Sequence, residues 1–387
     1  MDQLKFLILR LSAVGDVIRT LPAVKALKEY YPNSSITWIT EEPSRTLLET
    51  QPEIDKVLLL PRKRWTYGMK SLRSMGRTMG EGYGFILDLR RRRFDVALDF
   101  HGILKSGLLS FLSGAPQRIG FDRKSSKEGN FLFSNIKVRL PKERMSRFQK
   151  NFALLRGMGL EVNPVRNSNG SLNPARIIVK SHLPAEQRSI ISNGVNHFTP
   201  NLHVPEEDRE HIESFFNTLS LPIKRPLIAI HPGTSPKTIY KRWMADQYSQ
   251  LSDRLIHELN ATVIFTWGPG ELNWVEGIRK QMKEPSILGP QTESLTKLGE
   301  IFRRSNLYIG GDTGPMHIAS LMGVPVVVIY GPTDPIVNEP FGPHKKVRKE
   351  VGCNPCRKRS CKELTCLKTI QVDDVFKASN EILRITT

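Results

Sequence analysis

Short apolar runs alternate with segments whose apolar residues recur at helical spacing along most of the chain. Such runs are typical of strands buried in a parallel sheet, and the intervening segments are typical of the helices that cover it. In the first half we expect strands at 5–11, 36–39, 57–60, 94–102 and 118–121, with helices at 22–30, 45–49 and 104–112. In the second half we expect strands at 227–234, 262–267, 307–309 and 326–329, with helices at 244–259, 295–302 and 316–322.

The two halves therefore repeat one pattern, which predicts two α/β domains, each a doubly wound, Rossmann-like parallel sheet. Residues 163–174 interrupt the pattern because they are rich in Asn, Ser, Gly and Pro, and we interpret 163–197 as an insertion beside the interdomain linker. The predicted domains are 1–200 and 201–387. Two such domains facing each other across a cleft would place the loops at the carboxyl ends of both sheets, and any ligand, in that cleft.

A glycine-rich turn joins the strand at 307–309 to the helix at 316–322. It places Asp312, Thr313 and Gly314 directly before the helix begins. Free N–H groups and the positive end of the helix dipole favour an anion at such a position, so a phosphate or diphosphate is the first candidate ligand. An ordinary strand–turn–helix connection is the alternative.

The composition, 39% hydrophobic and 25% charged residues in 387, fits a soluble globular protein of two or three domains. No run approaches the roughly 18 apolar residues of a membrane-spanning helix. The N-terminal segment lacks a basic lead-in, and Arg10 shortens its apolar run, so it is typical of a first strand and not of a signal peptide. We therefore expect a cytoplasmic protein.

The net charge of +19 and the pI near 9.9 indicate an anionic partner. Residues 62–93 hold ten Lys or Arg against Glu81 and Asp88, and a second basic cluster spans 345–368. Such clusters suit a phosphorylated substrate, an anionic membrane surface or nucleic acid. Nucleic acid ranks last because no zinc-finger, RRM or helix-turn-helix signature accompanies them. A solvated basic face is the alternative.

Three further polar positions follow predicted strands. Asp16 comes at the end of the first strand, where a carboxylate can accept a proton from a substrate hydroxyl; helix N-capping is its alternative role. Lys241, beside Arg242, can neutralise a diphosphate, and otherwise both are surface charges. Glu271, after a Gly-Pro-Gly turn, can bind ribose hydroxyls or cap a helix.

Taken together and in this order, these motifs resemble a known family. The segments that carry the resemblance are 12–17 (SAVGDV), 231–234 (HPGT), 241–243 (KRW), 311–317 (GDTGPMH) and 330–335 (YGPTDP). They are similar to the ADP-heptose:lipopolysaccharide heptosyltransferases I and II of glycosyltransferase family 9, over essentially the whole chain except 163–197. The resemblance implies the GT-B fold, with two Rossmann-like domains across a cleft and a final helix, here near 373–385, that packs back on the first domain.

The implied reaction is inverting transfer of a heptose from ADP-L-glycero-β-D-manno-heptose to the inner core of lipopolysaccharide, without a metal. Asp16 matches the general base that deprotonates the acceptor hydroxyl, and Lys241 matches the lysine that neutralises the departing phosphate. The backbone of 313–315 would hold the diphosphate, Asp312 the heptose hydroxyls and Glu271 the ribose. The full implied donor set is Lys241, Glu271, Asp312, Thr313, Gly314 and Pro315, with His317 beside the donor.

Acceptors of this family carry carboxylates and lipid phosphates at a membrane surface. The resemblance therefore implies an enzyme peripheral to the inner membrane, with its anionic surface as a partner and no nucleic acid. The residues predicted to contact the acceptor or the membrane are Arg62, Lys63, Arg64, Arg90, Arg91, Arg92 and Arg93, with Trp65 beside the first three.

Four cysteines form a compact set near the C-terminus: Cys353, Cys356, Cys361 and Cys366. Their spacing lets four thiolates meet, which allows a structural zinc site, while reduced thiols and disulfides are the alternatives.

Two other functions fit the same residues. A transferase for another nucleotide sugar is one, because a diphosphate-binding loop does not read the sugar. A non-catalytic protein that binds nucleotide sugars or lipids is the other. A dinucleotide-dependent oxidoreductase is disfavoured, since no G-x-G-x-x-G follows the first strand.

Overall fold

The computed structural model describes residues 3–141, 144–166, 172–179, 197–198, 201–219, 225–356 and 358–386. The chain folds as two compact units, whose main boundary lies between Pro200 and Asn201, and residues 165–173 group with the second unit. Much of the predicted insertion at 163–197 lies outside the described residues. Strands β7 (Leu160–Arg166), β8 (Leu172–Val179) and β9 (His197–Phe198) form a small sheet that includes part of this segment.

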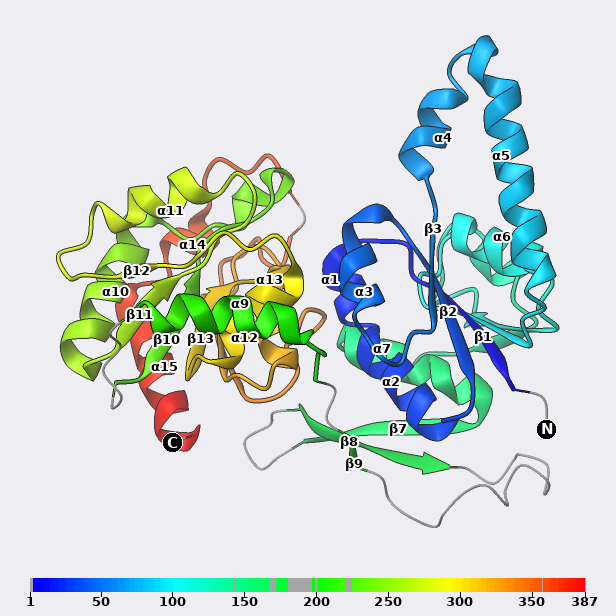
Figure 1. The fold of residues 1–387 in the computed structure, drawn as a ribbon. Helices are drawn as coiled ribbons and strands as arrows, with labels where there is room; N and C mark the ends of the chain where they lie inside the picture. The colour runs from blue at the N-terminus through cyan, green and yellow to red at the C-terminus, as the bar shows by residue number, and fades with distance from the viewer. Residues whose placement is uncertain are drawn as a thin grey trace. The chain divides into compact units, whose positions relative to one another are not determined.

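The N-terminal unit is built on a six-stranded, entirely parallel sheet of order β3-β2-β1-β4-β5-β6 (Figure 1). The strands are β1 (Lys5–Leu9), β2 (Ser35–Thr40), β3 (Lys56–Leu59), β4 (Val96–Asp99), β5 (Gln117–Phe121) and β6 (Ile136–Val138). The connecting helices are α1 (Val14–Ile18), α2 (Leu21–Tyr30), α3 (Arg45–Glu49), α4 (Arg62–Gly68), α5 (Leu72–Arg91), α6 (Leu104–Leu112) and α7 (Arg147–Leu154). Short 3₁₀ turns lie at Glu42–Ser44, Asn130–Leu132 and Leu155–Met158.

Strand β1 is central, so both of its faces are covered and its residues from Phe6 to Leu9 are fully buried. On one face Leu7 and Leu9 join a core cluster with Leu89 of α5 and Leu109 of α6. A continuous apolar run is what a strand covered on both faces requires, which explains why its position was predictable.

The C-terminal unit repeats this architecture in the order β12-β11-β10-β13-β14-β15, again all parallel. Its strands are β10 (Leu227–His231), β11 (Thr262–Phe265), β12 (Ile287–Leu288), β13 (Leu307–Gly311), β14 (Val326–Ile329) and β15 (His344–Val347). Its helices are α9 (Glu206–Asn217), α10 (Ala245–Leu259), α11 (Leu272–Arg279), α12 (Leu295–Arg303), α13 (Gly314–Leu321), α14 (Thr365–Lys368) and α15 (Val372–Thr386), with a 3₁₀ segment at Pro236–Lys241. The predicted α/β class and the doubly wound sheets are confirmed.

The last helix, α15, packs on α10 and β15 within the C-terminal unit. Val375 and Ile382 of α15 enter the core cluster of that unit together with Cys366 of α14. Packing of this helix on the N-terminal domain stays a prediction. Among the described residues, no helix combines the length and the apolar character that a bilayer span needs.

Candidate functional site

Both sheets reverse their strand order at one place, between β1 and β4 in the first unit and between β10 and β13 in the second. In open α/β sheets the loops that leave the carboxyl ends of two such strands diverge and leave a crevice for a ligand. Asp16 follows β1, and Asp312 follows β13. Asp16 and Asp312 therefore lie where this topology favours binding.

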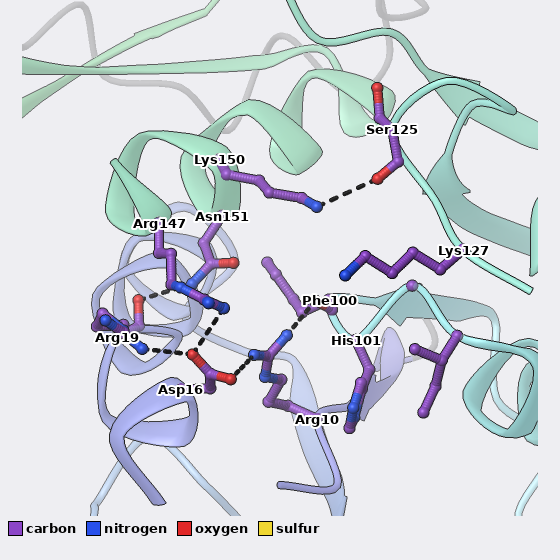
Figure 2. Close-up of a pocket in the computed structure, with 12 residues that line it drawn as sticks. Arg10, Asp16, Arg19, Phe100, His101, Ser125, Lys127, Arg147, Lys150 and Asn151 are labelled. Carbon is purple, nitrogen blue, oxygen red and sulfur yellow. Dashed lines mark hydrogen bonds and ion pairs between the residues drawn. The ribbon is translucent and has the colours of Figure 1, made fainter. Parts of the chain in front are cut away.

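Asp16 lies inside the short helix α1, which begins after Ala13, so it is not the N-cap that its alternative role requires. Its carboxylate contacts three guanidinium groups: Arg10 at 2.6 Å, Arg19 at 2.5 Å and Arg147 at 3.0 Å (Figure 2). Burial opposes the charged form, but the three arginines outweigh it and hold the pKa of Asp16 far below its usual range. Asp16 is therefore a carboxylate at any physiological pH.

Helix α7 brings Arg147 to this carboxylate from far along the chain. The helix begins with a capping box, in which Ser146 Oγ accepts from Gln149 N and Gln149 Oε1 accepts from Ser146 N. Asn151, one turn on from Arg147, donates to the carbonyl oxygen of Arg19 at 2.8 Å. This bond fixes α7 against the end of α1.

The loop after β4 forms another wall. Asp99 is fully buried, which raises the pKa of its carboxyl, and it accepts hydrogen bonds from Asn130 Nδ2, Ser106 Oγ and the N–H of Gly102. These bonds fix the turn that carries His101. His101 Nδ1 accepts from Leu11 N at 3.1 Å, and burial with the nearby Arg10 lowers the pKa of His101 to about 4, so the ring is neutral.

These elements enclose a cavity of about 210 Å³. Its lining residues are Arg10, Asp16, Arg19, Phe100, His101, Gly102, Ile103, Ser125, Lys127, Arg147, Lys150 and Asn151. Figure 2 shows the side chains of Lys127 and Lys150 extending into the space between α7 and the loop after β4. Burial, together with the nearby cations, lowers the pKa of Lys150 to about 8.

The cavity thus gathers five cationic side chains and one carboxylate. Lys150 Nζ donates to the carbonyl oxygen of Ser125 and lies 4.4 Å from the centre of the Phe121 ring, but neither partner carries a negative charge. An anionic ligand would relieve the mutual repulsion of the cations, so the pocket is suited to a carboxylate or phosphate group next to Asp16.

In the C-terminal unit, the loop after β13 brings together three predicted donor residues. Lys241 Nζ lies 3.2 Å from the carbonyl oxygen of Asp312 and 3.5 Å from its Oδ2. His317 Nε2 lies 4.0 Å from Asp312 Oδ1 on the other side. The buried Asp312 carboxylate is therefore held between a lysine and a histidine.

Thr313 is the N-cap of α13, and Gly314 is its first residue. The leading N–H groups of a helix have no partner within it, which leaves Gly314 and Met316 free to bind an anion. Pro315 carries no N–H, so its predicted part in holding a diphosphate is restricted to the shape of the turn.

Glu271 forms a separate pair with His231 at the end of β10, with Oε2 3.4 Å from His231 Nε2. Oε2 also accepts from the N–H of Gly268 at 2.7 Å. Burial favours the protonated form, yet His231 and this N–H lower the pKa of Glu271. A Cβ on Gly233 would collide with the Glu271 carboxylate, so a larger residue there would displace that carboxylate. Glu271 is also the N-cap residue of α11, although its side chain makes no capping bond.

The neighbours of Lys241 have structural roles. Arg242 donates from Nη2 to the carbonyl oxygen of Thr234 at 2.8 Å and lies over the Trp274 ring. Trp243 is buried and donates to the carbonyl oxygen of Ile370 at 3.0 Å.

Several of the predicted acceptor or membrane residues are engaged within the fold. Arg62 pairs with Glu41 at 2.9 Å and Arg64 with Glu81 at 2.8 Å, although both arginines, like Lys63, are exposed. Trp65 stacks edge-to-face on Phe85 at 5.7 Å and is half-buried. Its ring is therefore engaged within the hairpin and is not fully available to a membrane.

The run 90–93 is likewise partly engaged. Arg90 donates to the carbonyl oxygen of Leu112, and Arg92 pairs with Asp88 at 2.6 Å. Arg93 adopts a left-handed backbone conformation where the chain turns toward β4, and Arg91 is exposed.

The four cysteines are free thiols: Cys353 is exposed, Cys356 and Cys361 are half-buried, and Cys366 is buried. Burial raises the pKa of the Cys366 thiol, and the other three thiols are close enough to add to that shift. Within the described part of the chain, no group of three or more His, Cys, Asp or Glu side chains is arranged to hold a metal ion. Structural zinc stays a prediction.

Sequence reasoning missed most of the basic pocket. Arg10 and Arg19 lie close to Asp16 in the sequence, so basic residues near this carboxylate could have been noticed from the sequence alone. Arg147 and Lys150 gave no such signal in the sequence, because they reach the site only through the packing of α7.

Two units with this strand order in one chain, each with polar loops at its switch point, have the architecture of the GT-B glycosyltransferases. The sequence model of glycosyltransferase family 9 (heptosyltransferase) matches residues 84–367, and the chain belongs to this family of enzymes.

Individual proteins agree with this assignment. The lipopolysaccharide core heptosyltransferase OpsX of Haemophilus influenzae is 27% identical over 86% of this chain and 81% of its own. A family 9 glycosyltransferase from Veillonella parvula superimposes with a TM-score of 0.71 at 22% identity, covering 99% of this chain and 98% of its own. The E. coli heptosyltransferase WaaC with ADP-2-deoxy-2-fluoro heptose gives 0.68 at 17% identity, covering 98% and 99%.

Proposed function

We propose that the protein transfers a heptose from ADP-L-glycero-β-D-manno-heptose to the inner core of lipopolysaccharide, with inversion and without a metal. The proposal is carried by a pocket in a chain of family 9: its lining includes Asp16, which the motif resemblance assigns as the general base, together with five cationic side chains. The names of similar proteins support heptose as the sugar and lipopolysaccharide as the acceptor.

In the proposed reaction Asp16 accepts the proton of an acceptor hydroxyl, and the hydroxyl oxygen attacks the anomeric carbon of the heptose. The bond from that carbon to the diphosphate breaks, and ADP leaves with the electron pair. Lys241 and the N–H groups at the start of α13 would stabilise the charge that develops on ADP. Asp312 would bind heptose hydroxyls beside His317, and Glu271 would bind the ribose.

The three arginines beside Asp16 oppose its role as general base, because a carboxylate with a strongly lowered pKa is a weak base. Carboxylates or phosphates on the acceptor would reduce this effect. An acceptor anion bound by Arg147 and Lys150 would offset part of the positive field that lowers the pKa of Asp16. The base would then become stronger only when the acceptor is in place.

We extend the proposal to where the enzyme works: a lipid-linked acceptor lies at a membrane, so the protein would act in the cytoplasm as a peripheral protein of the inner membrane. Its net charge of +19 supports attraction to an anionic surface.

Turnover of a panel of nucleotide sugars with lipopolysaccharide core acceptors tests the proposal. Release of ADP from ADP-heptose, dependent on a heptose-deficient core acceptor, is the expected result. Preference for a different nucleotide sugar would instead favour the alternative, a related transferase. All donors are tested with the same enzyme sample, so turnover of one nucleotide sugar shows that the enzyme is active when another is not turned over.

A further inference from the structure

We propose that the outer part of the α4–α5 hairpin, residues 66–84 (the hairpin tip), docks on an anionic lipid bilayer. The inference rests on the proposed function in one respect, namely that a lipid-linked acceptor brings this enzyme to a membrane. Its physical basis is independent of that function and lies in the side chains of the tip.

The hairpin is anchored at its base and uncovered at its tip. Trp65 stacks on Phe85, and Leu89 is buried in the core below them. Figure 1 shows α4 and α5 side by side, projecting beyond the sheet of the N-terminal unit. A Cβ added at any of the α5 glycines would meet nothing within 4 Å; these are Gly76, Gly80, Gly82 and Gly84. The outer part of α5 therefore has uncovered surface within its own unit.

Large apolar side chains are concentrated on this uncovered surface. Tyr67 is 70% exposed, Met69 49%, Met79 59% and Tyr83 67%. Met79 and Tyr83 are four residues apart and so share one face of α5. A grouped set of exposed apolar side chains indicates an interaction surface, and tyrosine is favoured where apolar and aqueous phases meet.

Charge decides which partner fits. The hairpin tip carries Lys70, Arg73 and Arg77 against one carboxylate, Glu81, which pairs with Arg77 at 3.4 Å and with Arg64 at 2.8 Å. The tip therefore keeps a net positive charge. Lys70 Nζ lies 5.5 Å from the centre of the Tyr67 ring, so cationic and aromatic groups share the tip. Basic side chains beside partly inserted aromatic and aliphatic ones are the composition that binds anionic headgroups above an acyl layer.

This assignment adds the hairpin tip to the membrane contacts predicted at 62–64 and 90–93. Lys70 and Arg73 are exposed at the tip, and Arg90, Arg91 and Arg93 are exposed as well, although Arg90 donates to the carbonyl oxygen of Leu112. The tip differs from the run 90–93 in that its cations lie beside exposed apolar side chains.

The experiment measures binding of the full chain to vesicles of phosphatidylglycerol and phosphatidylethanolamine, without donor or acceptor, against phosphatidylcholine vesicles. We expect binding to the anionic vesicles only. The charge variant Lys70→Gln/Arg73→Gln/Arg77→Gln should weaken it by more than about tenfold, since each basic residue near such a surface contributes to attraction. The apolar variant Tyr67→Ser/Met79→Ser/Tyr83→Ser should weaken it as well.

Matched controls lie in the C-terminal unit: Lys280→Gln/Lys283→Gln/Lys368→Gln removes three exposed charges, and Ile385→Ser removes an exposed apolar side chain. Both should bind as the unaltered chain does, and thermal unfolding checks that every variant folds. Hydrogen exchange should slow at 66–84 when vesicles are added.

Several outcomes would overturn the proposal: tip variants that bind as tightly as the controls, vesicle binding that leaves exchange at 66–84 unchanged, a tip-dependent preference for RNA over vesicles, or tip-dependent dimer formation. Transfer to a soluble, lipid-free acceptor fragment separates the two proposals. If the unaltered chain transfers heptose to this fragment but does not bind the anionic vesicles, the docking surface alone is contradicted. If it binds the vesicles but does not transfer, the catalytic function alone is contradicted.

Discussion

The two switch points of this molecule share one topology and differ in charge. Between β1 and β4, one carboxylate, Asp16, contacts three arginines, and two lysines add further positive charge. Between β10 and β13, the carboxylates of Asp312 and Glu271 are each paired with a basic side chain, beside a helix start.

The difference shows that strand order determines where a ligand can bind, while the loops determine which ligand binds. An excess of cations suits an anion that arrives with its own negative charge. Balanced pairs at a helix start suit a neutral sugar attached to a diphosphate, since the carboxylates can accept from hydroxyls. The first site is therefore expected to serve the acceptor and the second the donor.

The largest expected effect concerns the first site. Asp16→Asn should lower the rate of heptose transfer roughly 10²- to 10⁴-fold, the range of a lost general base, while the affinity for ADP stays unchanged. Single-turnover kinetics and calorimetric titration with ADP measure the two quantities. Asp88→Asn, at an exposed carboxylate of α5, is the control and should transfer normally. Undiminished transfer by Asp16→Asn would show that Asp16 is not the general base.

Lys241→Ala tests the second site. It should reduce the rate of transfer roughly 10²- to 10³-fold, as loss of one group that stabilises developing charge does, and should also weaken ADP binding. Lys237 lies on the same 3₁₀ segment and is exposed, so Lys237→Ala is a matched control. Equal rates for the two variants would show that Lys241 only orders the loop through Asp312.

Gly233→Ala addresses the Glu271 pair without changing a polar group. The added methyl would displace the Glu271 carboxylate, and the loss of its hydrogen bonds should weaken ADP binding roughly 10- to 100-fold. Gly277→Ala, on α11 where a methyl meets nothing within 4 Å, should leave the affinity unchanged. If Glu271→Gln and Gly233→Ala both bind ADP normally, Glu271 has only a structural role.

The smallest effect is a pH dependence at the first site. Lys150 has a pKa lowered to about 8, so it is largely charged at pH 7 and largely neutral at pH 9. Sulfate, whose charge does not change over this range, should bind several-fold more weakly as the pH rises. Lys150→Gln should remove that part of the dependence, whereas Lys124→Gln, outside the pocket, should keep it. A flat profile for the unaltered protein would exclude Lys150 from anion binding.

The central strands of both sheets and about half of the helices were predictable because a doubly wound sheet leaves local signals, whereas the edge strands β6, β12 and β15 were not predicted. A central strand such as β1 must be apolar throughout, and the turn that follows it must carry the small and polar residues. The positions of Asp16 and Asp312 after β1 and β13 were predictable for the same reason. Helix α5 was missed because its several glycines dilute its apolar periodicity.

The electrostatics of the first site was not predictable in this way. Arg147 lies 131 positions after the carboxylate that it contacts, and only the packing of α7 against α1 brings the two together. The charge of a residue is known from the sequence, but the residues distant in sequence that contact it are known only from the structure.

The pairing of β1 with β4 joins residues ninety positions apart, as in the register of Phe6 with Val96, and the whole hairpin lies inside that loop. The entropy of closing a loop grows only with the logarithm of its length. Removing the hairpin tip, residues 66–84, would therefore change the closure free energy by merely about 0.2 kcal/mol. The free energy of closing the loop thus depends little on the length of the tip, so the tip can be shortened, lengthened or exchanged as a separable module while the anchored base of the hairpin and the Asp16 pocket are kept.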